Sequence, residues 1–435
     1  MMRRRTATTS LLLGLLASCS KPKPPIPGVQ IPVMSTVSGM DVSVDAPPVT
    51  LPQATALADW PQAWFNATHA PGNISAPLGF KPLWHTNIGT KGSYRQPLSA
   101  VPIIAGGMVF TMDANAVVRA VSLTDGTIAW HRPTRPKHST EPNIGGGVAY
   151  DSGKVYASTG YGEILALDAA SGKILWRQAL DFPTRTAPLV AGGLVSVVVQ
   201  NDLLLTFDAN SGQPGWRFTA AVGSPSITAV GITGAPAYAD GIIVAGFSSG
   251  MLAAIDANSG TPLWEQSLAG SFGQGSGVDM SDIVASPVIA GGVVYAINLG
   301  DTMMAVNLHS GAKVWTHSAA GTQTPCLAGG FVFLVDQTQT VYAVHADDGL
   351  VCWSLQLPAF GKPKTKKDPI QWVGPLLVNG TLVLVSDHKQ AALVDPVAGR
   401  LKAQVKLAAQ ADIPPIAAGG VLLQLTRDAK LTAYN

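Results

Sequence analysis

From about residue 82 to the C-terminus, the apolar residues of this chain come in short runs that turn residues interrupt at regular intervals. Many runs follow a proline and end in Gly-Gly, as in Pro188-Leu-Val-Ala-Gly192-Gly193. Gly-Gly between β-branched runs is a strong hairpin signal, because a tight turn needs positive φ at both central residues. Proline at the first residue of a strand costs no ladder hydrogen bond. The pattern starts eight times, with valine replacing proline in the second unit, at positions 102, 148, 188, 236, 287, 325, 375 and 415.

A second signal follows each start and usually ends on tryptophan. Asp168-Ala-Ala-Ser-Gly172-Lys-Ile-Leu-Trp176 shows its full form, in which the aspartate can bond its own backbone and the glycine accepts the left-handed conformation. Each unit therefore predicts four strands joined by three turns. The polar position of this signal is held in seven units by Ser122, Asp168, Asp208, Asp256, Asn307, His345 and Asp395. The tryptophans are Trp84, Trp130, Trp176, Trp216, Trp264, Trp315 and Trp353, and the seventh unit has Ala403 instead.

A fixed period of this size indicates a repeat architecture, and four-stranded units of this length suit the blades of a β-propeller. The eighth unit is cut short, because Leu431-Thr-Ala-Tyr-Asn435 matches a third strand and the sequence stops there. Leu83-Trp84-His85 matches a fourth strand that has no unit ahead of it. We therefore expect an all-β, eight-bladed β-propeller over residues 81–435, with the N-terminal strand closing the last blade. The tryptophans are expected to pack blade against blade.

The N-terminus has the features of a secretory signal, with three arginines in Met1–Arg5 followed by an apolar stretch from Leu11 to Ala17. Leu16-Ala17-Ser18-Cys19 resembles a bacterial lipobox, which implies cleavage after residue 18 and lipidation of Cys19. Ser20 in the next position implies sorting to the outer membrane. An ordinary signal peptide with a chance cysteine is the alternative. Residues 19–80 are rich in proline and suit a lipidated tether, of which Trp60–Phe65 is expected to lie against the propeller.

Charge argues against nucleic acid as a partner. Without residues 1–18 the chain has 25 Lys+Arg, since three of the 28 are removed, against 26 Asp+Glu. A nearly neutral body lacks the basic patch that nucleic acid requires. The two remaining cysteines, Cys326 and Cys352, fall on the first and fourth strands of one unit. Three strand spacings put them roughly 14 Å apart, too far for a disulfide, so they are predicted to be unpaired.

The sequence offers no constellation that predicts catalysis, a cofactor or a metal site. Its three glutamates, Glu141, Glu163 and Glu265, fall in different units, and the histidines are dispersed. No nucleophile elbow, phosphate loop or dinucleotide fingerprint is present. The glycine-rich stretch 270–277 is expected to be a loop. The basic run Lys362–Lys367 is interpreted as a solvated loop, with an anionic headgroup or an acidic partner as the alternative.

The second signal of each unit, as in Ala166-Leu-Asp168 through Trp176, resembles the repeats of pyrroloquinoline-quinone-like propellers. Two groups share these repeats: quinoprotein dehydrogenases, which oxidise alcohols or sugars with a quinone and a metal ion, and the non-enzymatic BamB family of outer-membrane lipoproteins. The dehydrogenases carry a vicinal cysteine pair and a cluster of acidic and amide metal ligands near the ring axis. Cys326 and Cys352 are not adjacent, and the lipobox, tether and minimal eight-bladed body resemble the BamB layout. The resemblance therefore implies a scaffold and no enzyme.

Long connections indicate where a partner would bind, because loops carry function on rigid blades. Connections from a fourth strand to the next first strand all emerge on one face, and 217–235, 265–286 and 354–374 are the long ones. The first two are consecutive and are expected to form a contiguous rim. In the BamB family the corresponding loops are implicated in docking to the POTRA domains of BamA. The resemblance thus implies a partner-binding set of Ile227, Ala229, Val230, Asp279, Met280 and Asp282. Burial of Ile227 and a turn-capping role for Asp282 are the competing readings.

These features together predict a lipid-anchored scaffold at the periplasmic face of the outer membrane. Its expected partners are BamA and other components of the β-barrel assembly machinery, with unfolded outer-membrane proteins held transiently by strand addition. The alternatives are a quinone-dependent dehydrogenase and a periplasmic glycan-binding propeller.

Overall fold

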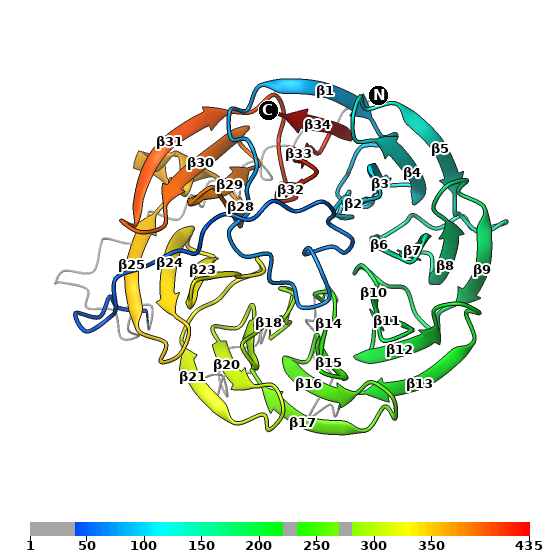
Figure 1. Cartoon of the computed structure of the whole chain (residues 1–435), viewed down its shortest axis with the longest axis horizontal. Coiled ribbons are helices and arrows are strands. Elements are labelled where there is room, and N and C mark those ends of the chain that lie inside the picture. The colour runs from blue at the N-terminus through cyan, green and yellow to red at the C-terminus, as the bar shows by residue number, and fades with distance from the viewer. Residues whose placement is uncertain (1–39, 221–232, 269–280) are drawn as a thin grey trace, which may run out of the picture. The chain divides into compact units, whose positions relative to one another are not determined.

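The computed structural model describes residues 40–220, 233–268 and 281–435, and its compact unit runs from Ser38 to Asn435. Eight four-stranded antiparallel sheets follow one another around a ring, with the first strand of each sheet nearest the axis (Figure 1). The predicted eight-bladed propeller is confirmed. Among the described residues no helix is both long and apolar enough to cross a membrane.

Each blade is a meander of consecutive strands. Blades 1 to 4 are, from the axis outward, β2 (Ile103–Ala105), β3 (Met108–Met112), β4 (Val117–Ser122) and β5 (Ile128–Pro133); β6 (Gly146–Asp151), β7 (Lys154–Thr159), β8 (Glu163–Asp168) and β9 (Ile174–Ala179); β10 (Leu189–Ala191), β11 (Leu194–Val199), β12 (Leu203–Asp208) and β13 (Pro214–Thr219); β14 (Ala237–Ala239), β15 (Ile242–Gly246), β16 (Met251–Asp256) and β17 (Pro262–Ser267).

The second half of the ring continues the same order until the last blade, which combines both ends of the propeller. Blades 5 to 8 are β18 (Val288–Ala290), β19 (Val293–Ile297), β20 (Met303–Asn307) and β21 (Lys313–His317); β22 (Cys326–Ala328), β23 (Phe331–Val335), β24 (Thr340–His345) and β25 (Val351–Gln356); β28 (Trp372–Val378), β29 (Thr381–Ser386), β30 (Gln390–Asp395) and β31 (Arg400–Lys406); β32 (Ile416–Ala418), β33 (Val421–Leu425), β34 (Lys430–Tyr434) and β1 (Pro82–Asn87). The strand β1 pairs antiparallel with β34, Trp84 opposite Ala433, as the sequence predicts.

The tryptophans join neighbouring blades, as expected. The Trp176 indole donates from Nε1 to the carbonyl of Ala209, 3.2 Å away, in the turn of the next blade. The ring also lies on Gly212 of that turn. The same indole-to-carbonyl bond reaches the next blade from each of the other tryptophans of the repeat, namely Trp84, Trp130, Trp216, Trp264, Trp315 and Trp353.

Position 403 holds alanine where the other blades hold tryptophan. An indole at this position would reach the turn between the third and fourth strands of blade 8. In that blade the two strands come from opposite ends of the propeller, so no continuous turn joins them. Asn435 directly follows β34 and donates from its amide to the carbonyl of Lys81, which directly precedes β1. The Phe80 ring, just before this junction, lies 5.6 Å from the ring of Tyr434.

The glycine of each receiving turn is expected to be intolerant of a side chain. Gly212 has a φ of +72°, and a Cβ there would lie 2.6 Å from Cδ2 of Trp176. Backbone strain and the clash together should make Gly212→Ala lower the free energy of unfolding by about 2–3 kcal/mol. Gly193→Ala in the same blade is the matched control, because its φ is +79° but nothing lies within 4 Å. Chemical denaturation of both variants checks this, and equal losses would show that the ring contact is unimportant.

Residues 40–80 pack on the ring and belong to the same compact unit as the blades. Trp60 lies against blade 1, as predicted, and it exchanges two backbone hydrogen bonds with Ile104 of β2, of 2.7 and 2.9 Å. The segment crosses the centre of the ring in Figure 1. Its other hydrogen bonds reach the remaining seven blades at Tyr150, Val190, Tyr238, Ile289, Val351, Leu377 and Gly419. We call residues 40–80 the lacing segment.

The two described cysteines are both free, which confirms the prediction. Cys326 lies on β22 and Cys352 on β25, the innermost and outermost strands of blade 6. Burial raises the pKa of the Cys326 thiol to about 12, so it is protonated at neutral pH.

Candidate functional site

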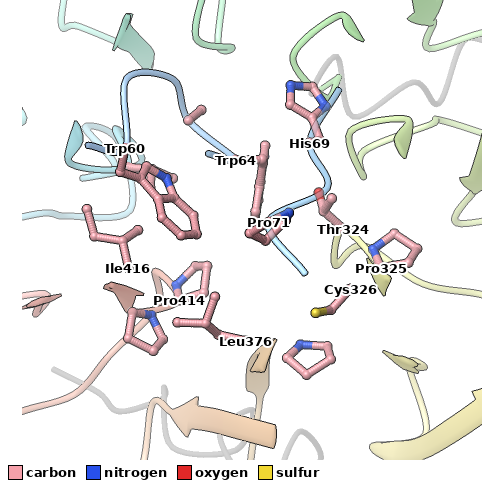
Figure 2. A pocket seen from close by; sticks show the side chains of 14 residues that line it. Trp60, Trp64, His69, Pro71, Thr324, Pro325, Cys326, Leu376, Pro414 and Ile416 are labelled. Atoms are coloured by element: carbon pink, nitrogen blue, oxygen red, sulfur yellow. The ribbon is translucent and has the colours of Figure 1, made fainter. Parts of the chain in front are cut away.

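The axis of the ring is filled by the lacing segment and by the starts of the first strands. Trp60, Trp64 and Pro71 meet Pro325 and Leu376 there, around a small cavity (Figure 2). The cavity has a volume of about 20 Å³, which is room for a single water molecule. Prolines that begin the repeats therefore have a second role, since three of them help to close the axis: Pro325, Pro375 and Pro415.

His69 is the titratable side chain among the residues that line this cavity, apart from the Cys326 thiol. The imidazole is buried, and its Nδ1 donates to the carbonyl of Pro287 over 2.8 Å. Desolvation by burial lowers the pKa of His69 to about 4, against a smaller opposing effect of the Pro287 carbonyl. The imidazole is consequently neutral at physiological pH and serves to fasten the lacing segment to blade 5.

The residues at the axis do not suit the quinone and metal ion of a dehydrogenase. The lining is mainly proline, tryptophan and aliphatic side chains, with Thr324 and His69 as its polar members. Among the described residues, no group of three or more His, Cys, Asp or Glu side chains is placed to hold a metal ion. A divalent cation requires oxygen ligands that this lining does not supply.

The two faces of the ring differ in what covers them. In an antiparallel blade the first-to-second and third-to-fourth turns share one face, and the remaining connections share the other. The lacing segment binds at the ends of first strands that lead into tight turns, as at Ile104 and Val190, so it lies toward the first of these faces. The opposite face, which we call the loop face, holds the described ends of the connections 217–235 and 265–286 and the connection 354–374.

Most of the sequence-predicted partner-binding residues lie outside the described residues. Ile227, Ala229 and Val230 fall in 221–232, and Asp279 and Met280 fall in 269–280. Asp282 is described and is fully buried, with its backbone carbonyl accepting the amide of Leu299 over 3.0 Å. A direct contact of its carboxylate with a partner is therefore less consistent with the structure than a role in holding the loop.

The described ends of the two consecutive loops are joined to each other. Gly234 donates from its amide to the carbonyl of Ile283 over 3.2 Å, and Ala235 donates to Oγ of Ser286 over 3.0 Å. A Cβ on Gly234 would lie 2.5 Å from the backbone of Ser286, so the two ends are in close contact. Ile283 is itself buried against Gly246 of β15. The loops thus leave the ring from a shared base.

Two buried polar side chains stabilise this base. The carboxylate of Asp202, 5% exposed, accepts the amides of Ser248 and Ser249 over 2.8 and 3.0 Å, which ties blade 3 to blade 4. Asn298, fully buried, donates from Nδ2 to the carbonyl of Leu268 over 2.8 Å and accepts the amide of Thr302 over 2.8 Å. Buried groups satisfied in this way rigidify their surroundings.

Sequence reasoning missed these two anchors. Asn298 directly follows a second strand, as Asp113 and Asp336 do in their blades, and all three side chains accept backbone amides of the next turn. A polar residue after the second strand is thus a further signal of the repeat. Asp202 lies in the turn between the second and third strands of blade 3, directly before the third strand, and Gln339 at the same place in blade 6 accepts the amide of Trp372 over 2.8 Å.

Comparisons with known proteins agree on the fold and give relatives from two functional groups. The family model described as outer membrane protein assembly factor BamB matches residues 114–355. A curated relative, outer membrane protein assembly factor BamB of Yersinia pestis, is 26% identical over 241 residues, which are 54% of this chain and 60% of the relative. Quinohemoprotein alcohol dehydrogenase ADH IIB of Pseudomonas putida is 28% identical over 148 residues, 30% of this chain and 21% of the relative. The chain thus spans less than two thirds of the length of these relatives.

Similar solved structures also come from both functional groups. The structure of BamB from Moraxella catarrhalis superposes with a TM-score of 0.66 at 16% identity, covering 80% of this chain and 99% of that chain. Quinohemoprotein alcohol dehydrogenase from Comamonas testosteroni gives a TM-score of 0.67 at 14% identity, covering 85% of this chain and 76% of that chain. At these identities the superpositions establish the fold alone.

Proposed function

Since this chain belongs to the family of outer membrane protein assembly factor BamB, whose model matches 114–355, we propose that it is a non-enzymatic scaffold of the β-barrel assembly machinery. In this role the rigid ring holds its partner proteins in fixed positions relative to one another while outer-membrane proteins are inserted.

The observation that carries this proposal is the filled ring axis. The dehydrogenase reading needs metal and quinone ligands there, but the cavity among Trp60, Pro325 and Leu376 has a volume of only about 20 Å³. The lacing segment supplies Trp60 and is bound to all eight blades, so opening the axis would break contacts around the whole ring. This arrangement supports a scaffold over a cofactor-dependent enzyme.

The loop face is the proposed docking surface for the POTRA domains of BamA. The shared base at Gly234 and Ile283 supports one continuous rim formed by 217–235 and 265–286. On this rim Ile227, Ala229, Val230, Asp279 and Met280 are the proposed contacts. Asp282 acts as a positioning residue, because its own side chain is fully buried. Transient contact with unfolded outer-membrane proteins is part of the same proposal.

The location is proposed from the N-terminus. Residues 1–18 act as a lipoprotein signal, Cys19 receives the lipid, and the ring is held at the periplasmic face of the outer membrane. Residues 20–39 then connect the lipid to the lacing segment, which leaves a shorter tether than the composition of 19–80 suggests.

The docking surface is tested by affinity purification from outer membranes. Ile227→Asp combined with Met280→Asp should reduce recovery of BamA about tenfold, because apolar contacts at the centre of an interface carry most of its binding energy. The matched control is Leu175→Asp with Val314→Asp, which places the same charges on exposed outer-strand positions of β9 and β21.

Unchanged recovery of BamA by the loop variant would contradict this docking surface. Failure of the unaltered chain to recover any assembly component, together with dye-coupled alcohol oxidation after addition of quinone and calcium, would establish the dehydrogenase instead. Retention on glycan beads without either behaviour would indicate the glycan-binding module.

A further inference from the structure

The connection from blade 6 to blade 7 folds into a hairpin of its own. It consists of β26 (Phe360–Lys362), the 3-10 turn η1 (Pro363–Thr365) and β27 (Lys367–Pro369). All residues from 361 to 369 are exposed. The hairpin carries four lysines: Lys362, Lys364, Lys366 and Lys367.

Positive charge is concentrated on this hairpin and the blade that follows it. Residues 360–406 contain eight Lys+Arg and three Asp, a net charge of +5. Residues 19–435 contain 25 Lys+Arg and 26 Asp+Glu, a net charge of −1, so the remainder carries −6. No ion pair involving the four hairpin lysines occurs among the described residues. Their charge is therefore available to an anionic ligand.

An apolar groove of about 650 Å³ lies beside the hairpin that carries these lysines. Its walls come from the end of β25, from the hairpin and from β31, and Lys366 stands among the lining residues. Leu401 of β31 is 39% exposed and lines this groove. The main apolar side chains of the groove are Leu355, Leu357, Phe360, Pro363 and Leu401.

The hairpin is held in place rather than loosely attached. At its base, Ile370 donates from its amide to the carbonyl of Ala359 over 2.9 Å. The Trp372 indole, fully buried, donates from Nε1 to the carbonyl of Pro358 over 2.9 Å. On its side, the imidazole of His388 lies 3.1 Å from Asp368 of the hairpin.

The same imidazole joins the hairpin to the body of blade 7. His388 Nδ1 lies 2.8 Å from the carboxylate of Asp387, which also accepts the amide of Gln371 over 2.9 Å. The hydrogen bond that His388 donates to the Asp387 carboxylate is the largest effect that raises the pKa of His388, which favours the charged, bridging form. The groove is thus preformed, and binding to it need not order the hairpin first.

We propose that this lysine-rimmed groove binds an extended peptide segment of a partner protein that carries both acidic and apolar side chains. The apolar walls accept leucine-sized groups, and the lysines pair with carboxylates, which gives charge complementarity at the rim. A membrane surface fits less well. The hairpin tip, Pro363 to Lys366, has no large apolar side chain to insert into lipid, and the apolar residues are recessed in a concave site.

The test uses the purified mature chain and a fluorescein-labelled peptide that alternates aspartate with leucine, followed by anisotropy. Lys364→Glu with Lys366→Glu should raise the Kd at least about tenfold. Added salt should also raise the Kd of the unaltered chain, because it screens the lysine charges. Leu401→Asp should raise the Kd as well. The matched control, Lys173→Glu with Lys313→Glu, makes the same change of net charge on other blades and should leave the Kd within twofold.

Several results would overturn the proposal. Equal binding of the peptide and its asparagine counterpart would remove the role of charge, and loss of binding in the control pair would make the effect non-specific. Binding of phosphatidylglycerol vesicles, but not of the peptide, with the same dependence on Lys364 and Lys366 would assign the surface to lipid. Circular dichroism of each variant checks that it is folded. Lys364→Gln with Lys366→Gln should lower the affinity for the peptide less than the charge-reversal variant does. Failure here leaves the rim at 217–235 and 265–286 untouched, because BamA recovery is measured separately.

Discussion

Trp60→Ala is expected to lower the free energy of unfolding by about 3–5 kcal/mol, the range for deleting a buried tryptophan side chain. Trp60 is 2% exposed, and its ring lies 5.5 Å from that of Phe65. It also stands at the ring axis, where Pro71 and Ile416 complete the lining, so its removal enlarges a cavity that nothing else fills. Urea denaturation followed by circular dichroism measures the loss.

Trp64→Ala is the control for this variant. Trp64 lies in the same segment and lines the same cavity but is only half-buried, so its loss should be clearly smaller. Equal losses would mean that the lacing segment is stabilised by its general apolar content rather than by the fit of Trp60 at the axis.

Acidification should destabilise the chain through His69 by about 3 kcal/mol in total, at 1.36 kcal/mol for each pKa unit between an ordinary histidine and this one. The pKa of His69 is lowered from 6.5 to about 4 in the folded chain. Between these two values the unfolded chain binds a proton that the folded chain does not. The contribution of His69 is therefore complete above about pH 6.5 and is lost as the pH falls toward 4.

His69→Gln isolates this contribution, because glutamine can donate to the Pro287 carbonyl but does not titrate. The difference in free energy of unfolding between the natural chain and the variant should shift by about 2–3 kcal/mol against the natural chain from pH 7 to pH 4.5. Parallel pH profiles would show that the imidazole is protonated, or exposed, in the folded state.

The blades could be predicted from sequence because each rests on local, repeated signals. Gly-Gly turns, the Asp-x-x-x-Gly turn and the tryptophan recur at a fixed period, and their physical roles do not depend on distant residues. Even the exception at Ala403 follows from closure, because the turn that would receive a tryptophan is divided between Asn435 and Lys81.

The lacing segment could be anticipated only at Trp60–Phe65, where the aromatic residues indicated a contact. Elsewhere its proline-rich composition resembles a tether, and its attachment uses mainly backbone amides and carbonyls, which leave no residue pattern. The loop face was predicted from spacing alone. Its anchors at Asp202 and Asn298 were missed, because which turns meet across two blades is a property of the ring and not of any one repeat.

The lacing segment also sets an order for folding. Ile74 bonds with Leu377, and Asn379 bonds with Ala76, 303 residues away in the sequence. The lacing segment can therefore complete its contacts only after blade 7 has formed. The strand β1 can pair only once β34 has been synthesised. Contacts of such high sequence separation form late, since the entropy of closing a long loop opposes them. Until blades 7 and 8 have formed, the bonds from the lacing segment to Leu377 and Gly419 cannot form, so the segment is incompletely attached to the ring.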